Sequence, residues 1–544
     1  MKIVFTVFFI FLSANLISQP VEEWVRRYNG PGNSFDIVSK LLLGKNDNVF
    51  VYGSGNGKGS LYDFTVINYD SKGNTKWTET YNGPGNSSDN IISACIDAQN
   101  NSYVTGFTTD TSFVSNVTTA KFDSSGNMIW LKEYKNPVFS HGYGVDIALD
   151  YTGNINVCGA GMFISSGNYT SLILKYSADG NLLGSFIFDT SGTTSNIPVK
   201  IKITSSNKII VSGTSENISG SRDMYVSMLN DLNGIFRTVV INGSSDQDAD
   251  LSDMVLDNEN NIYICGSMRN ISSSVDYYYA KLDTACKIIW SGVFNGTGND
   301  TDIPYKLFND SERNTYITGY SRNSNFTGSE DMLTLKISGS GNLLWSRVYN
   351  GPENGIDQGF SVVTDDEGNV YVGGGSDRKI NDLIYMLLKY DANGNLLWTK
   401  NYFYNALSED FIYDIKLDAA NNIYVTGISI GQGSSFDFAT IKYSQTTGII
   451  PVSDIFPDNF ILYQNYPNPF NPSTNLEFGI SKLGFVSLKV YDLLGNEIKT
   501  LVNEVLPAGS YKIKFDSSGL SSGVYFYALT AGNFTDKKKM IILK

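Results

Sequence analysis

Histidine is almost absent from this chain: His141, in "FSHGYG", is the only one among 544 residues. A histidine-rich metal site is therefore excluded, and any histidine general base would have to be this residue. It stands just before an apolar strand, so we expect a structural role for it. Zinc motifs, phosphate-binding glycine loops and serine-nucleophile elbows are also missing, and no catalytic residue, metal or cofactor is predicted.

Positive charge is scarce as well. Lys and Arg number 40 against 54 Asp and Glu, which gives a formal net charge of −14. The longest basic run is Lys537 to Lys539. Because binding to phosphate backbones needs clustered Lys and Arg, this balance argues against nucleic acid, and no nucleic-acid partner is predicted.

Long apolar runs are missing too. Residues 1–18 begin with Met1-Lys2 and continue through "IVFTVFFIFL", which predicts a secretory signal peptide cleaved near Ser18. That run is too short to span a bilayer, and no later segment reaches eighteen apolar residues, so no transmembrane segment is expected.

Cysteines are few, only four in a chain expected to be exported. Cys158 and Cys265 occupy the same place in two units that are not neighbours, so they should not pair. A Cys265–Cys286 bond remains open, but buried free thiols are the favoured interpretation.

Glycine (52), tyrosine (34) and phenylalanine (31), by contrast, are abundant, and no helical period of useful length appears. This composition favours strands and tight turns, and predicts an all-β protein. The length is too great for a single ordinary core, so several domains or a repeat array are expected.

A repeat of about 53 residues dominates residues 19–450. All six tryptophans stand in one context, as in "GNTKW" and "GNLLW", and Gly184 and Arg237 occupy the same place in two degenerate units. A glycine follows each of these eight anchors by 29 residues. The anchors are Trp24, Trp77, Trp130, Gly184, Arg237, Trp290, Trp345 and Trp398.

Each unit contains four short strand patterns separated by turns rich in Asn and Gly. Radial repetition of four-stranded units is typical of a β-propeller, which hides the sheet edges. The apolar strand is predicted to be innermost and the Trp strand outermost. The chain begins on a Trp strand and ends the array without one, so residues 22–29 should complete the last sheet, giving eight blades.

The units "DxxGNxYVTG…DxxTxKYDxxGNLLWxxxYNGPGN" resemble the SBBP repeat family, whose name stands for seven-bladed β-propeller. The resemblance covers about residues 22–450 and implies a propeller. This chain departs from the family name, because its own count is eight.

The stretch "YQNYPNPFNPST", Tyr463 to Thr474, holds three of the thirteen prolines. It follows a predicted linker, 444–459, and opens a domain, 460–544, with about seven short alternating strand patterns. These predict a small Ig-like β-sandwich. The prolines should hold the entry segment extended over an edge of the sandwich.

This stretch, with "VYDLLGNEIKTLV", "AGSYKIKFD", "SGVYFYAL" and "KKKMIILK", resembles the type A C-terminal sorting domain of type IX secretion, found in Bacteroidota-like bacteria. The resemblance implies that the chain crosses the outer membrane through the type IX secretion machinery and is secreted or held on the outer cell surface. The residues that carry it are Tyr466, Pro467, Asn468, Pro469, Phe470, Asn471, Pro472, Gly495, Gly523, Tyr525, Lys539 and Lys544.

Two recurring residue types could be mistaken for sites. The tryptophans are expected to pack between blades rather than to stack on sugars. Aspartates stand twelve residues after five anchors, and could form a carboxylate ring at a channel mouth or could each cap a turn; repetition in every good copy favours caps. These aspartates are Asp36, Asp89, Asp302, Asp357 and Asp410.

Ligand residues of a propeller usually break its repeat symmetry. The loop Asn401 to Asp410 does so, and its three aromatics Tyr402, Phe403 and Tyr404 are the candidates for ligand contact. We expect a non-enzymatic scaffold for binding or adhesion, with a polysaccharide or surface-protein ligand. The alternatives are a polysaccharide lyase or hydrolase acting through paired carboxylates, and a purely structural surface component.

Overall fold

The computed structural model describes most of the chain. The described residues are 19–190, 192–243, 247–270, 274–322, 329–379, 382–404, 409–431, 433–445, 450–453, 457, 459–482, 484–506, 508–517 and 520–543. The expected signal peptide, 1–18, lies outside them. The chain divides into two compact units, Glu22–Tyr443 and the part from Ser444 onward. In the described residues no helix has both the length and the apolar character needed to cross a bilayer.

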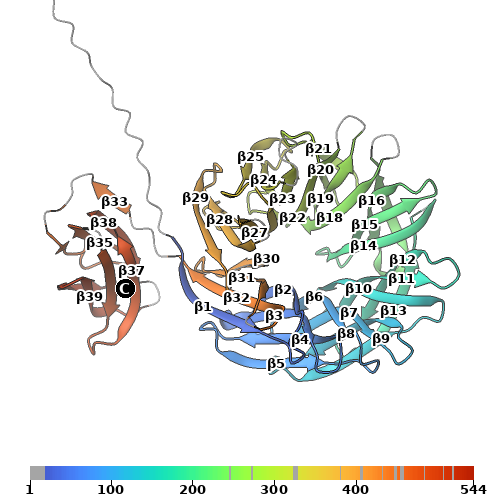
Figure 1. Cartoon of the computed structure of the whole chain (residues 1–544), viewed down its shortest axis with the longest axis horizontal. Coiled ribbons are helices and arrows are strands. Elements are labelled where there is room, and N and C mark those ends of the chain that lie inside the picture. Colours follow the sequence, from blue (N-terminus) through green and yellow to red (C-terminus); the bar gives the residue numbers. More distant parts are fainter. Residues whose placement is uncertain are drawn as a thin grey trace, which may run out of the picture. The chain divides into compact units, whose positions relative to one another are not determined.

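Eight antiparallel four-stranded sheets make up the first unit, as far as its residues are described (Figure 1). Two single turns of 3₁₀ helix, η1 (Lys45–Asp47) and η2 (Asp231–Asn233), lie in connections between consecutive strands. From the innermost strand outward, the sheets are β2 (Ile37–Leu43), β3 (Val49–Asn56), β4 (Tyr62–Tyr69), β5 (Thr75–Tyr81); β6 (Asn90–Ile96), β7 (Ser102–Thr109), β8 (Ser115–Phe122), β9 (Met128–Tyr134); β10 (Phe139–Leu149), β11 (Ile155–Phe163), β12 (Tyr169–Tyr176), β13 (Leu182–Phe188); β14 (Thr193–Ile203), β15 (Ile209–Asn217), β16 (Arg222–Leu229), β17 (Ile235–Ile241); β18 (Ala249–Leu256), β19 (Ile262–Arg269), β20 (Val275–Leu282), β21 (Ile288–Phe294); β22 (Asp302–Asn309), β23 (Thr315–Arg322), β24 (Glu330–Ile337), β25 (Leu343–Tyr349); β26 (Asp357–Thr364), β27 (Val370–Lys379), β28 (Asp382–Tyr390), β29 (Leu396–Tyr402); and β30 (Phe411–Leu417), β31 (Ile423–Ile430), β32 (Phe436–Ser444), β1 (Val21–Tyr28).

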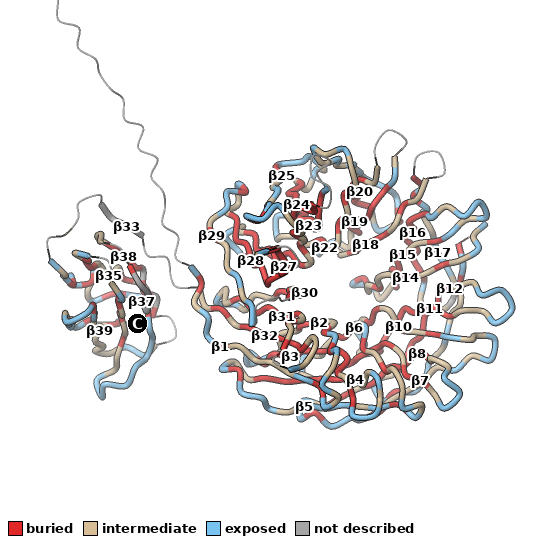
Figure 2. Tube along the Cα trace, viewed as in Figure 1, coloured by how far each residue is buried: buried red, intermediate tan, exposed pale blue. Residues whose placement is uncertain are grey.

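The sheets form a closed ring. Each innermost strand contacts that of the next sheet, and β30 contacts β2, so the eighth sheet meets the first. The strand β1 completes the eighth sheet beside β32, as the sequence predicts. Burial is concentrated on the second and third strands of each sheet, whereas an outer strand such as β5 is largely exposed (Figure 2).

The tryptophans join neighbouring sheets, as expected from their position in the repeat. In five cases the indole N–H donates to a backbone carbonyl in a turn of the next sheet, each time at 3.1 Å. The indole then covers a glycine of that turn whose φ is positive, a conformation that favours glycine. The donor–acceptor pairs are Trp24–Ser71, Trp77–Ser124, Trp130–Ala178, Trp290–Gly339 and Trp345–Ala392.

The four cysteines are free thiols, and Cys158, Cys265 and Cys286 are buried. The Cys265–Cys286 disulfide that the sequence left open is therefore not formed.

The second unit has two four-stranded sheets in its described residues. Their orders are β33–β38–β35–β34 and β37–β36–β39–β40. The strands are β33 (Ile450–Ser453), β34 (Ile461–Leu462), β35 (Ser473–Ile480), β36 (Gly484–Tyr491), β37 (Glu497–Leu506), β38 (Gly509–Asp516), β39 (Gly523–Ala531) and β40 (Phe534–Ile542). Buried apolar side chains from both sheets form one core. Part of the segment expected as a linker, Ile450–Ser453, is a strand of this unit.

Candidate functional site

The proline-rich segment of the second unit is tied to the surrounding strands. The phenol of Tyr527 donates to the carbonyl of Tyr463 (2.8 Å) and accepts from the N–H of Asn465 (2.7 Å). The side chain of Asn465 donates to Thr474 Oγ1 and to the carbonyl of Pro467 (both 3.0 Å). The segment is therefore held by the side chain of its own Asn465 and by Tyr527, a buried tyrosine that sequence reasoning did not single out.

The predicted sorting residues occupy different places in this segment. Phe470 is buried in the core and bonds the last strand through its backbone, whereas Tyr466 is 80% exposed. The side-chain oxygen of Asn468 accepts from the N–H of Ile541 (2.9 Å), and its side-chain nitrogen donates to the carbonyl of Lys539 (3.3 Å).

The other predicted residues have local roles. The three prolines, Pro467, Pro469 and Pro472, each follow a cis peptide bond, the last of them after Asn471. Gly495 adopts a positive φ in the turn between β36 and β37. Gly523 begins β39, the phenol of Tyr525 donates to the carbonyl of Ser521, and Lys544 lies outside the described residues.

In the first unit, each buried aspartate twelve residues after an anchor caps its own turn. Asp36 accepts from the N–H groups of Gly30 (2.7 Å) and Asn56 (2.6 Å), and Asp89 accepts from those of Gly83 and Thr109. These bonds agree with the structural interpretation of the set. Burial raises the pKa of all five carboxyls, Asp36, Asp89, Asp302, Asp357 and Asp410, to about 6.

The raised pKa values predict a pH dependence of stability. Between pH 4 and pH 6 the folded state holds protons that the unfolded chain, with its ordinary pKa of 3.8, has released. Stability should therefore fall as the pH rises from 5 to 7, by about 1 kcal/mol for each carboxyl. Urea midpoints at the two pH values measure the change.

Asp36→Asn tests the origin of this effect, because Asn196 stands at the equivalent position of the fourth sheet and accepts there from Thr190 N at 3.1 Å. The variant should show a smaller decrease between pH 5 and pH 7. Asp70→Asn, in an exposed turn, is the matched control and should leave the decrease unchanged. A urea midpoint that rises over this range would contradict the assignment.

A polar ring surrounds the centre of the eight sheets. One residue of each innermost strand, sixteen after the anchor, is charged or a serine: Lys40, Ser93, Asp146, Lys200, Asp253, Lys306, Ser361 and Asp414. Asp146, Asp253 and Asp414 each accept from a backbone N–H of the next innermost strand at 3.1–3.2 Å. The bond from Leu41 N to Asp414 joins the first sheet to the eighth.

Lysines balance these buried carboxylates. Lys306 lies 3.2 Å and Lys200 3.9 Å from Asp253, and Lys416 lies 2.6 Å from Asp414. Burial opposes ionisation of Asp253, but the lysines outweigh it and hold its pKa below the ordinary value. Burial lowers the pKa of Lys40, which donates to Ser93 Oγ at 3.1 Å, to about 8.

A β-bulge precedes this polar ring in all eight innermost strands. The bulge residues, fifteen after each anchor, are Ser39, Ile92, Val145, Val199, Ser252, Tyr305, Phe360 and Tyr413. Bulges re-aim a side chain and recur beside functional sites. Three consecutive sheets therefore carry an aromatic where the other five carry a serine or an aliphatic residue.

These three aromatics touch one another across the sheets. The rings of Tyr305 and Phe360 are stacked at 4.9 Å and 19°, and Tyr413 meets Phe360 edge-on at 5.3 Å. Phe411 packs against both Phe360 and Tyr413. We call Tyr305, Phe360, Phe411 and Tyr413 the aromatic arc; all four are partly exposed.

The three aromatics predicted for ligand contact lie at the end of β29 (Tyr402) and directly after it (Phe403 and Tyr404). Tyr402 packs against Tyr385, while Phe403 and Tyr404 are 43% and 45% exposed. A guanidinium covers one ring face of each: Arg378 lies 4.0 Å from the Phe403 centroid and Arg27 lies 4.3 Å from that of Tyr404. Each therefore offers one free face at most.

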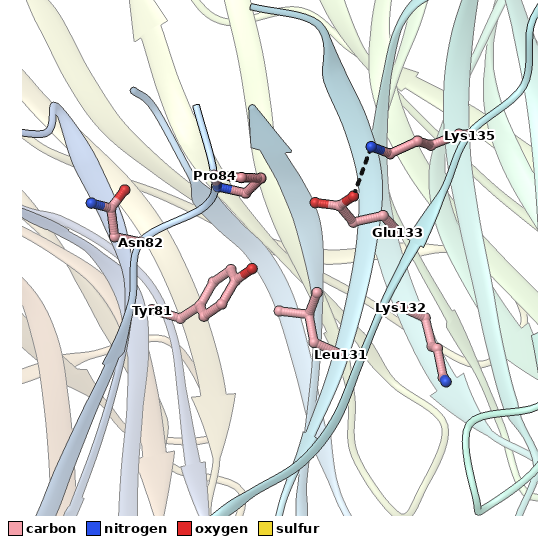
Figure 3. A pocket seen from close by; sticks show the side chains of 7 residues that line it. All are labelled: Tyr81, Asn82, Pro84, Leu131, Lys132, Glu133 and Lys135. Atoms are coloured by element: carbon pink, nitrogen blue, oxygen red, sulfur yellow. Dashed lines mark ion pairs between the residues drawn. The ribbon is translucent and has the colours of Figure 1, made fainter. Parts of the chain in front are cut away.

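Two hollows and the single histidine lie elsewhere on the first unit. Figure 3 shows an open hollow between β5 and β9, where Tyr81 and Leu131 lie near the Glu133–Lys135 ion pair (3.1 Å). A smaller hollow is lined by Val199, the bulge residue of the fourth sheet. His141, the lone histidine, is exposed and lies 3.3 Å from Ser115 Oγ.

Comparison with protein families gives one match. Residues 464–543 match the family model described as the secretion system C-terminal sorting domain. The match indicates export by type IX secretion, interaction with that machinery, and release or attachment at the outer surface. No curated protein matches the chain.

Several solved structures resemble this chain weakly. They include the WD40 domain of SCAP from fission yeast (10% identity, TM-score 0.44, 77% of this chain and 98% of that one). PorZ, an essential surface component of the type IX secretion system of Porphyromonas gingivalis, is 10% identical, with a TM-score of 0.30, and the match covers 93% of this chain and 81% of that one. The β-propeller domain of the Trilobed protease from Pyrococcus furiosus is 9% identical, with a TM-score of 0.34, over 63% and 91%. Likenesses this weak say nothing about function.

Proposed function

We propose that this chain is an exported binding protein. Residues 1–18 act as a signal peptide, the unit of residues 22–443 is an eight-bladed propeller of SBBP type, and the sorting domain delivers it to the cell exterior. The propeller is a non-enzymatic scaffold whose ligand is a polysaccharide or another surface protein.

The observation that carries the binding role is the aromatic arc. Five of the eight bulge positions carry a serine or an aliphatic residue. The other three, in consecutive sheets, carry aromatic side chains that are partly exposed, so the repeat pattern is broken on one side of the ring only. Exposed aromatic clusters of this kind mark binding surfaces on soluble proteins.

The enzymatic alternative has less support. A glycosidase or lyase acting through paired carboxylates needs acidic groups free to reach a substrate. The recurring aspartates are bound to backbone amides, and those of the polar ring to lysines and backbone amides. No group of three or more metal-ligating side chains is found in the part of the chain that the structure describes.

The test is a screen of the purified full chain for saturable binding, first to polysaccharides, with and without calcium, and then to proteins of the producing cell's envelope. We expect one of the two ligand classes to bind, and Phe403→Ala in the predicted contact loop to weaken that binding. Absence of binding in both screens would favour a purely structural component. Release of sugar fragments during the screen would overturn the non-enzymatic role.

A further inference from the structure

The aromatic arc has the construction of a stacking platform. Its three bulge residues come from β22, β26 and β30, which are innermost strands of consecutive sheets that contact each other. The near-parallel pair Tyr305–Phe360 meets the second near-parallel pair, Phe411–Tyr413 (6.2 Å, 17°), edge-on. The arc is thus an aromatic surface shared by three sheets and fixed by the rigid backbone of each.

Positive charge lies beside the arc. The residue that follows each bulge belongs to the polar ring, so Lys306 is next to Tyr305, and Lys416 lies three residues after Tyr413. Their side chains are 37% and 31% exposed. Counting Lys202 and Lys416 with the polar ring, five lysines meet three aspartates, a net charge of +2 inside a chain of −14.

This combination fits one ligand chemistry. The face of an aromatic ring is electron-rich and attracts the polarised C–H bonds on the apolar face of a pyranose, while lysines attract an anionic substituent. Polar groups stand at the edge of the arc: Arg322 pairs with Glu330 at 2.6 Å, and Gln358 donates to the same carboxylate. Lys306 and Lys416 each pair with an aspartate, and the excess of lysines over aspartates in the polar ring would contribute nothing to the binding of an apolar peptide side chain.

We propose that the aromatic arc binds an anionic polysaccharide, with a sugar ring packed against the exposed parts of the arc and a carboxylate or sulfate attracted by Lys306 and Lys416. The inference rests on the proposed binding function and names its ligand class. The arc and the lysines belong to the same strands, so both are positioned by the bulge.

The test is calorimetric titration of the full chain with polygalacturonate and with dextran sulfate, which carry carboxylate and sulfate. Fully methyl-esterified polygalacturonate and dextran are the matched neutral polymers. We expect one anionic polymer to bind at least about tenfold more tightly than its neutral partner, and raised salt to weaken that binding.

Variants locate the site. Phe360→Ala should weaken binding about tenfold, Phe360→Tyr should retain it, and Lys416→Gln should weaken the anionic polymer alone. Ile92→Ala, at the bulge of the second sheet, is the matched control and should bind normally. Thermal unfolding of each variant shows whether the protein remains folded; if Phe360→Ala does not fold, Phe360→Leu, which keeps an apolar side chain without the ring, replaces it.

The outcomes separate this inference from the proposed function. Equal binding of neutral and anionic polymers, or normal binding by Phe360→Ala, overturns the inference. Failure of all four polymers also overturns it, while capture of an envelope protein would leave the binding function standing. Loss of both kinds of binding would overturn the two together.

Discussion

Replacing Trp345 by alanine will lower the free energy of unfolding by about 3–5 kcal/mol. Its side chain is 8% exposed, its indole N–H donates to the carbonyl of Ala392 at 3.1 Å, and its ring covers Gly394 of the next sheet. The substitution leaves a cavity at the junction of two sheets and removes one of the two hydrogen bonds that the Ala392 carbonyl accepts, the other coming from Lys336. Urea unfolding of the full chain measures the loss.

Two comparisons separate packing from hydrogen bonding. Trp345→Phe keeps an aromatic ring but loses the N–H, so we expect it to cost less than alanine, about 1–2 kcal/mol. Gly184, which has no side chain at this position, marks a junction built without a tryptophan, and Gly184→Ala should have an effect of under about 1 kcal/mol. A loss below 1 kcal/mol for Trp345→Ala would mean that the tryptophans do not hold the sheets together.

Asp253→Ala is expected to be the most damaging change in the polar ring, also at about 3–5 kcal/mol. Asp253 is 2% exposed, and its carboxylate raises the pKa of Lys306 and accepts from the N–H of Leu307. Removing the carboxylate leaves the N–H of Leu307 without this acceptor, and leaves Lys200 and Lys306 without the negative charge that pairs with them. The midpoint of urea unfolding again provides the measurement.

A second substitution shows whether charge is the cause. Lys306→Met in the Asp253→Ala background removes one uncompensated ammonium, so the double variant should be more stable than the single one. Asp253→Asn keeps an acceptor for Leu307 and should lie between alanine and the natural residue. If the double variant is as unstable as the single one, the loss comes from packing instead of charge.

The architecture could be predicted because it depends on local patterns. The spacing of the tryptophans and of the "VTG" glycines determines the four-strand unit, and the Trp strand at the start of the array predicts the place of β1. The capping role of Asp36 could also be predicted, because a side chain that bonds nearby backbone repeats with its turn.

The arc and the polar ring could not be found in this way. Tyr305, Phe360 and Tyr413 read as ordinary members of apolar strands, and the bulge that re-aims them is a change of register between two strands, which no single strand reveals. Their signal was present only as three aromatics at one repeat position. The partners of Asp253 come from sheets on both sides of its own, so its pairing depends on how neighbouring sheets pack.

The joint between the first and last sheets of the ring limits when the first unit can finish folding. The eighth sheet joins β1 to β32, and the ion pair between Arg27 and Asp437 spans 410 residues of sequence. Both ends of the first unit must therefore reach the same compartment before this sheet can form. A contact between residues so distant in sequence is also slow to form. A chain that is still threading through a membrane can order its intermediate sheets, but the ring remains open at this joint until the last strand has passed.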